Sequence, residues 1–206
     1  MKAMFANGAR GAVILAAFSL GFTALMAGTY WLTAESVHKN EEAARTLLIA
    51  QTLPAGSYDN NLLASSIALT LEQSRRLGND EVTQVYQAKQ GGKTVAAVLE
   101  AVAPDGYAGK IKLLVAVGSD GRTLGVRVVS HKETPGLGDY IDAAKSDWIL
   151  QFDGKSLSAP PADRWKVKKD GGAFDSNAGA TISPRAMVKA VKNTLEFVQA
   201  NPALFK

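Results

Sequence analysis

The chain has 206 residues, of which 47% are apolar and 20% charged, so it can bury one core of ordinary size and is not disordered by composition. Its net charge is only +4, and it has no basic run interleaved with aromatic residues, so nucleic acid is a poor candidate partner. It has no cysteine, which excludes disulfides, cysteine-held iron–sulfur clusters and cysteine-linked haem. It has only two histidines, which disfavours a histidine-rich metal site. Any redox chemistry would therefore need an organic cofactor.

An uncharged segment of 24 residues, Gly11 to Ala34, lies near the N-terminus. A helix needs about 20 apolar residues to cross the hydrocarbon core of a bilayer. Lys2 and Arg10 precede the segment, and Tyr30 and Trp31 lie near its far end, so the positive-inside rule places the N-terminus in the cytoplasm. A cleaved signal peptide is the alternative, with an apolar region of usually about 7–15 residues. Because this segment is longer, we expect a retained anchor that crosses the membrane once, with a soluble domain outside.

A helix is expected to begin at Asn40 and to end before Pro54, continuing or closely following the membrane helix. Residues 68–80 are interpreted as a short helical or irregular connection. Two antiparallel hairpins follow, because apolar residues then recur with a period of two and the turns contain glycine. Their segments are 82–89 with 94–103, and 110–117 with 123–130.

The two strands of the second hairpin should each present one apolar face. The first would carry Ile111, Leu113, Val115 and Val117, and the second would carry Leu124, Val126 and Val128.

The C-terminal part is expected to contain two helices. Asp139 can cap the first, and Ser183 and Pro184 are suitable as N-cap and first residue of the last. Hairpins followed by helices indicate an α+β domain. The apolar side of the first helix would carry Ile141, Ala144, Trp148 and Phe152, and that of the last Val188, Val191, Leu195 and Val198.

No catalytic constellation is found. The sequence GKT at residues 92–94 lacks the earlier glycine of a phosphate-binding loop, since Gln87 stands in its place. Ser183 lacks the GxSxG context of a hydrolase nucleophile. Trp148 and Trp165 could stack on a ligand, although core packing is the commoner role of tryptophan, and His131 is interpreted as a neutral loop histidine.

Two loop segments offer room for a ligand. In ETPGLG, Glu133 to Gly138, glycines on both sides of Leu137 let the backbone approach a flat molecule, whereas a simple tight turn is the alternative. In DSNAGAT, Asp175 to Thr181, the residues before the threonine have almost no bulk. A phosphate on Thr181 would lie near a helix N-terminus, which favours an anion by about 0.3–1 kcal/mol.

Three nearby lysines could add positive potential to this second segment: Lys166, Lys168 and Lys169. The alternative is that the small residues only pack the helix start and that the lysines are solvated.

These two segments also resemble sequence motifs of a known protein family. DSNAGAT is similar to the flavinylation motif Asp-x-x-Ser/Thr-Gly-Ala-Thr, whose last threonine bears FMN through a phosphoester bond made by a flavin transferase. With ETPGLG and the N-terminal anchor, nearly the whole chain resembles the G subunit of the Rnf (Rsx) ion-translocating electron transport complex. The chain departs from the motif at Ala178, where a Ser or Thr is usual.

The resemblance implies a site. Thr181 would carry FMN covalently, Asp175 would serve recognition or metal positioning during transfer, and no catalytic residue or resident metal is expected. The low-bulk approach to Thr181 would be Gly179 and Ala180, and the flavin would be lined by Glu133, Thr134, Gly136, Leu137 and Gly138.

The resemblance also implies a role: an electron-transfer flavoprotein subunit of a complex that couples ferredoxin/NAD-type electron transfer to ion translocation. Its partners would be the other subunits, the flavin transferase and the lipid bilayer, and its place the bacterial inner membrane with a periplasmic C-terminal domain. Two alternatives stay open, the FMN subunit of the sodium-pumping NADH:quinone oxidoreductase and a flavin-free assembly subunit.

The expected parts of the chain are a cytoplasmic end (1–10), a membrane helix (11–33), a helical connector (34–80) and an FMN-binding domain (81–206).

Overall fold

The structure, a computed structural model, describes residues 2–205, and the side chains of residues 2–7 and 41–42 lie outside the described set. The chain divides into two compact units, one up to Arg45 and one from Thr46 onward.

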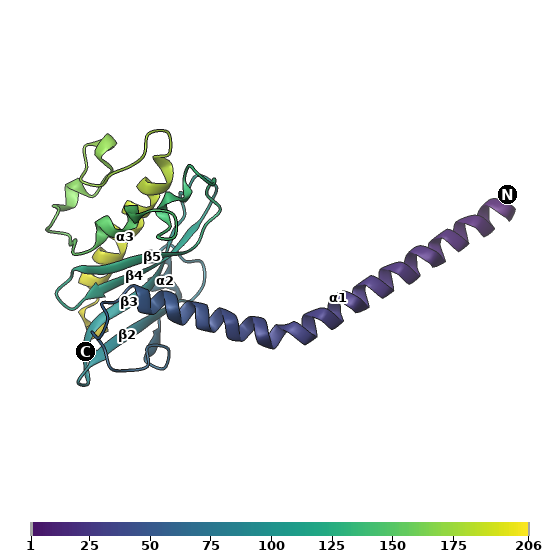
Figure 1. Cartoon of the computed structure of the whole chain (residues 1–206), viewed down its shortest axis with the longest axis horizontal. Helices are drawn as coiled ribbons and strands as arrows, with labels where there is room; N and C mark the ends of the chain where they lie inside the picture. Colours follow the sequence, from purple (N-terminus) through teal and green to yellow (C-terminus); the bar gives the residue numbers. More distant parts are fainter. Residues whose placement is uncertain (1, 206) are drawn as a thin grey trace. The chain divides into compact units, whose positions relative to one another are not determined.

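The first unit is formed by α1 (Lys2–Gln51), whose last residues belong to the second unit (Figure 1). The predicted helical segment continues the N-terminal helix, which is one of the two expected arrangements, and only the predicted start at Asn40 is wrong, because Asn40 lies inside α1. The helix continues because no glycine or proline interrupts residues 29–51. Within the described part of the chain, α1 is the one helix that is long and apolar enough to cross a membrane, judged by length and composition.

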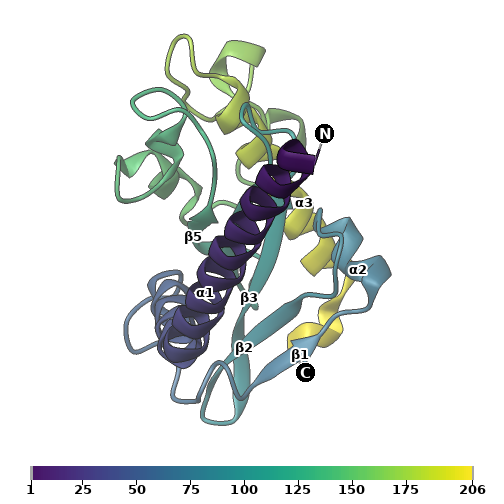
Figure 2. The ribbon, with the colours of Figure 1, turned by 90° about the vertical axis from the view of Figure 1, so that its right-hand side faces the viewer.

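The second unit is built on an antiparallel sheet with strand order β1-β2-β3-β4-β5. Figure 2 labels β1, β2 and β3, the first three strands of this order. Both predicted hairpins are confirmed, as β2 with β3 and β4 with β5. The edge strand β1 was not predicted, because three residues are too few to show an alternating pattern. The strands are β1 (Ser66–Ala68), β2 (Gln84–Gln90), β3 (Lys93–Ala103), β4 (Ile111–Gly118) and β5 (Thr123–Ser130).

A short helix, α2 (Leu71–Arg76), connects β1 to β2 and agrees with the interpretation of residues 68–80. Its start is fixed by a capping box. The Thr70 hydroxyl accepts a hydrogen bond from the Gln73 amide, and the Gln73 side chain accepts one from the Thr70 amide.

The sheet has an apolar cluster on each face. The larger cluster contains the predicted face of β4 and packs under α3 (Ile182–Ala200). The smaller cluster contains the alternate residues Leu114 and Ala116, together with Ile49 from the last turn of α1. Strand alternation thus places the two clusters on opposite faces.

Leu124 packs against the smaller cluster, whereas Val126 and Val128 belong to the larger one, so the predicted common face of these three residues is wrong. Ala116 pairs with Gly125, but Val117 pairs with Thr123. Leu124 is therefore the extra residue of a β-bulge, and a bulge disturbs the alternation of side chains between the faces.

The segment after β5 contains four 3₁₀ helices before α3. The helix predicted after Asp139 is wrong, because Ser146 has an extended backbone (φ −162°, ψ 163°) and separates η1 from η2. The Asp139 carboxylate instead accepts a hydrogen bond from the Gly136 amide at 2.8 Å. The 3₁₀ helices of the unit are η1 (Asp139–Ile141), η2 (Asp147–Phe152), η3 (Ala162–Arg164), η4 (Lys168–Asp170) and, after α3, η5 (Pro202–Phe205).

Helix α3 begins earlier than predicted. Its N-cap is Thr181, and Ser183 and Pro184 are its second and third residues, so their predicted capping positions are wrong. The Ser183 hydroxyl bonds to the Glu133 carboxylate instead, and proline is tolerated because first-turn amides need no helical acceptor. The predicted apolar stripe is confirmed, since Val188, Val191, Leu195 and Val198 are all buried.

Gly125 in β5 provides a test of this packing. A Cβ atom at this position would lie 2.5 Å from the carbonyl oxygen of Thr52, which is backbone and cannot rotate away. We expect Gly125→Ala to lower the free energy of unfolding by about 1–3 kcal/mol, measured by urea denaturation. The control is Val129→Ala, at an exposed position further along the same strand, whose free energy of unfolding should lie within about 0.5 kcal/mol of the wild-type value. Equal stability of the two variants would contradict the close approach.

Candidate functional site

The carboxylate of Glu133 connects three segments of the domain. Its side chain lies in the loop after β5 and is only 4% exposed. Oε1 accepts a hydrogen bond from the Ala108 amide at 3.0 Å, and Oε2 accepts one from the Ser183 hydroxyl. A buried carboxylate is costly unless donors satisfy it. The loop before β4, the loop after β5 and the first turn of α3 are therefore held together at one point.

The ETPGLG segment is a tight turn that packs against this point. The amides of Leu137 and Gly138 both donate to the Thr134 carbonyl at 3.1 Å, and Gly136 has a φ of +75°, which favours glycine. A Cβ atom on Gly138 would lie 2.8 Å from Ser183 Oγ and 2.9 Å from Glu133 Oε2. Gly136 thus allows the turn and Gly138 allows the close packing, while Leu137 between them is exposed.

The phenol of Tyr140 holds the low-bulk segment that precedes Thr181. Its oxygen accepts a hydrogen bond from the Asn177 amide at 3.0 Å, and its hydroxyl donates to the Ala180 carbonyl at 3.0 Å. The side chain is buried, and this burial raises the pKa of the Tyr140 hydroxyl, while the Asn177 hydrogen bond acts in the opposite direction. The residues on either side of Ala178 and Gly179 are thus bound to one group.

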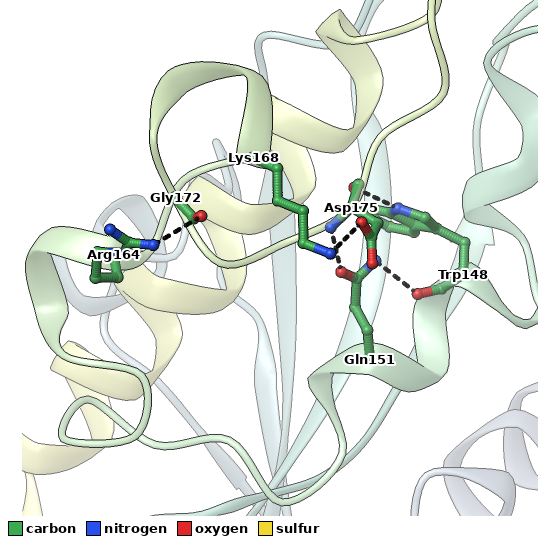
Figure 3. A network of polar contacts seen from close by, with 6 residues as sticks. All are labelled: Trp148, Gln151, Arg164, Lys168, Gly172 and Asp175. Carbon is green, nitrogen blue, oxygen red and sulfur yellow. Dashed lines mark hydrogen bonds and ion pairs between the residues drawn. The ribbon is translucent and has the colours of Figure 1, made fainter.

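The backbone of Asp175 is fixed by η2 (Figure 3). Its amide donates to Gln151 Oε1 and its carbonyl accepts from Trp148 Nε1, both at 2.7 Å. Its carboxylate is exposed and forms an ion pair with Lys168 at 2.6 Å. An exposed pair of this kind contributes about 0–1 kcal/mol. The position of Asp175 is therefore set by its main chain, and its carboxylate stays accessible.

The two tryptophans that the sequence left open lie in packed positions. Trp165 is buried against Phe152 and Phe174. Trp148 is half-buried and makes edge contacts with Tyr140 and Phe152, at centroid distances of 5.6 and 5.5 Å. Both indoles thus act as packing groups in this structure.

Of the three lysines expected near Thr181, Lys168 is the one paired with Asp175. A residue that the sequence reasoning missed lies closer to the helix start. Arg185, in the first turn of α3, donates to both oxygens of Asp170 at 2.6 and 2.7 Å. This hydrogen bonding lowers the pKa of the Asp170 carboxyl and raises that of Arg185.

Thr181 itself is the N-cap residue of α3 and is 7% exposed. Its hydroxyl makes no capping hydrogen bond, although capping is the usual role of a threonine there. The amides of Ile182 and Ser183 have no acceptor within the helix. Gly179, two residues earlier, is exposed with a φ of +84°, and a Cβ atom there would meet nothing within 4 Å. The arrangement offers an uncommitted hydroxyl beside a helix N-terminus, behind an exposed segment of small residues.

The structure brings the two predicted segments together through Glu133, Gly138 and Ser183, and through Tyr140. Thr134, Gly136 and Leu137 are exposed on the turn, and Glu133 is a buried packing group. Their roles toward a ligand stay predictions. Sequence reasoning missed Tyr140, Gln151 and the Ser183 partner of Glu133, because each acts over 24 or more residues of sequence separation.

Two family models match the chain. One, described as an FMN-binding domain, matches residues 106–196, and the other, described as the RnfG N-terminal region, matches residues 1–52. Among similar proteins is the G subunit of the ion-translocating oxidoreductase complex of Vibrio atlanticus, 45% identical over 93% of this chain and 90% of that protein. The corresponding protein from Pseudomonas aeruginosa (strain UCBPP-PA14) is 47% identical over 93% of this chain and 89% of its own length.

The close packing at Gly138 predicts a stability effect. Gly138→Ala should lower the free energy of unfolding by about 1–3 kcal/mol, because the new methyl group would press on two buried, hydrogen-bonded side chains. Leu137→Ala, on the adjacent exposed residue, should change it by less than about 0.5 kcal/mol. Urea denaturation of both variants measures the difference. A Gly138→Ala variant as stable as wild type would show that the turn can move away from Ser183.

The raised pKa of Tyr140 predicts a loss of stability in alkali. Between the ordinary tyrosine pKa of about 10 and the higher folded pKa, the folded state keeps a proton that the unfolded state has lost, so stability falls as pH rises. Tyr140→Phe lacks this proton, so its melting temperature should fall less steeply above about pH 10 than that of wild type. Parallel curves for the two proteins would contradict the prediction.

Proposed function

The chain belongs to the G subunit family of ion-translocating oxidoreductase complexes, and on this premise we propose that it carries FMN esterified to Thr181 and relays electrons through it. The single observation that supports the attachment point best is the Thr181 hydroxyl, which stands at the helix start without serving as its cap.

The residues around Thr181 fit a phosphate ester. The N-terminus of α3 favours an anion by about 0.3–1 kcal/mol, and the amides of Ile182 and Ser183 are first-turn donors that a phosphate oxygen can use. Gly179 and the exposed residues Asn177 and Ala178 leave the approach without bulky side chains. Ala178 replaces the usual hydroxyl residue of the motif at an exposed position, and no contact of the attachment point depends on it.

When bound, FMN supplies one-electron transfer, and the chain supplies position and potential. Glu133 and Ser183 fix the start of α3, and Tyr140 fixes the segment before Thr181. A covalent link keeps the cofactor on a domain that faces the outer side of the membrane. No general base and no nucleophile other than the modified threonine is required.

Modification requires access to Thr181, which is largely buried. Asp175 and residues 177–179 are exposed, so a flavin transferase would meet the segment 175–180 first. The two hydrogen bonds of Tyr140 hold this segment in place, and the carboxylate of Asp175 is exposed. Opening the segment at Tyr140 would bring the hydroxyl to the transferase while Asp175 stays fixed.

Helix α1 is the anchor of a membrane complex subunit in this proposal. The charge pattern supports an N-terminus in the cytoplasm, and with it a domain from Thr46 onward in the periplasm of a bacterial inner-membrane protein. The partners are the other subunits of the complex, and the electron transfer is of the ferredoxin/NAD type.

The attachment is tested by co-expressing the chain with a flavin transferase and observing flavin fluorescence on a denaturing gel. We expect a fluorescent band for wild type and for Thr181→Ser, which keeps a hydroxyl, and none for Thr181→Ala. Ser176→Ala removes the other hydroxyl of the same segment and should stay fluorescent. A fluorescent Thr181→Ala band would overturn the site, and a dark wild-type band would favour a flavin-free assembly subunit.

A further inference from the structure

An aromatic side chain outside the two predicted segments lies exposed beside the site. Tyr107 is 68% exposed and, among the described side chains from Thr46 onward, is the one aromatic residue that is exposed. It lies in the loop between β3 and β4, which sequence reasoning assigned no role toward a ligand. Most exposed apolar side chains are unremarkable when they occur singly. The surroundings of Tyr107 make it a different case.

The loop that carries Tyr107 is tightly turned. Gly109 has a φ of +124°, and a Cβ atom on Gly106 would collide with the Gly109 carbonyl oxygen, so the four residues GYAG form a closed turn. Tyr107 bears the only large side chain of this turn. Because the turn has no interior, the ring must lie outside it.

The same loop is bound to α3 on both sides of Tyr107. On one side, Asp105 forms an ion pair with Lys189 of α3 at 2.7 Å. On the other, the Ala108 amide bonds to Glu133, whose second carboxylate oxygen bonds to Ser183 in the first turn of α3. The loop on both sides of Tyr107 is thus bound to α3, once directly and once through Glu133, and Ser183 is two residues from Thr181.

Two further exposed apolar side chains belong to the same junction. Leu137 projects from the turn that packs on Ser183, and Ile182 is the first residue of α3. Three segments that meet at Glu133 therefore each present one exposed apolar side chain. An aromatic ring held without a protein partner, beside other apolar groups, is suited to stack on a flat aromatic ligand.

We propose that Tyr107 packs against the isoalloxazine ring of the flavin and shields it from water. This inference rests on the proposed attachment of FMN to Thr181. The tether fixes the phosphate end of the cofactor, and Tyr107 with Leu137 fixes the ring end. The phenol hydroxyl stays in solvent, so the contact is made by the ring.

The test uses the full chain in detergent, labelled with 3-fluorotyrosine, with and without covalent loading by the transferase. The chain has five tyrosines, and loss of one ¹⁹F resonance in Tyr107→Phe assigns the signal. The ring current of the flavin should shift the Tyr107 resonance on loading. Tyr58 and Tyr86, which pack on the opposite face of the sheet, are internal controls and should not shift. An unmoved Tyr107 resonance in fully loaded protein overturns the proposal.

A second measurement follows the flavin itself. In loaded Tyr107→Leu, iodide should quench flavin fluorescence severalfold more efficiently than in wild type, while Tyr107→Phe should behave as wild type because it keeps the ring. Equal quenching in the leucine variant counts against the contact. Loss of the wild-type covalent band would instead refute the attachment, so the two failures are distinguishable. The NMR comparison uses the native tyrosine and decides the question even where the leucine variant does not fold.

Discussion

The buried carboxylate of Glu133 is the constraint on which the site depends. A negative charge removed from water is tolerated only where hydrogen-bond donors surround it, and here the donors come from the Ala108 amide and the Ser183 hydroxyl. The Ala108 amide belongs to the loop between β3 and β4, and the Ser183 hydroxyl belongs to the first turn of α3, a helix that also packs on the larger cluster. The carboxylate therefore links that loop to the start of α3, which directly follows Thr181.

The same constraint explains why two glycines enclose the carboxylate. A Cβ atom on Gly106 would lie 3.0 Å from Oε1, and one on Gly138 would lie 2.9 Å from Oε2. Larger residues would separate the loops from Glu133 and leave the charge partly unpaired. The low bulk of ETPGLG thus serves a protein carboxylate at Gly138, while the side chain of Leu137 is exposed.

Features that depend on local pattern were predictable, and features that depend on distant partners were not. The two hairpins and the inward face of β4 follow from alternation, and the stripe of α3 follows from its helical period. Thr181 was singled out by its motif.

The predicted N-cap of α3 was misplaced because Ser183 bonds to Glu133, fifty positions away, instead of capping the helix. Leu124 was misplaced because a bulge in β5 leaves no signal in a single strand. The hydrogen bonds of Tyr140 to Asn177 and Ala180 could not be predicted, because no pattern in the nearby sequence indicates them.

Helix α1 does not end where the membrane segment ends. Its last turn carries Ile49, which is fully buried in the smaller cluster of the sheet, and Leu53 follows it there. The last turn of this long apolar helix is thus also a core element of the domain from Thr46 onward. A soluble fragment intended for crystallisation or redox titration must consequently start before Thr46, because a cut at the membrane-distal end of α1 would open a cavity under β2 and β3. It also follows that protease release of the domain should occur in the exposed part of α1 and not at its junction with the sheet.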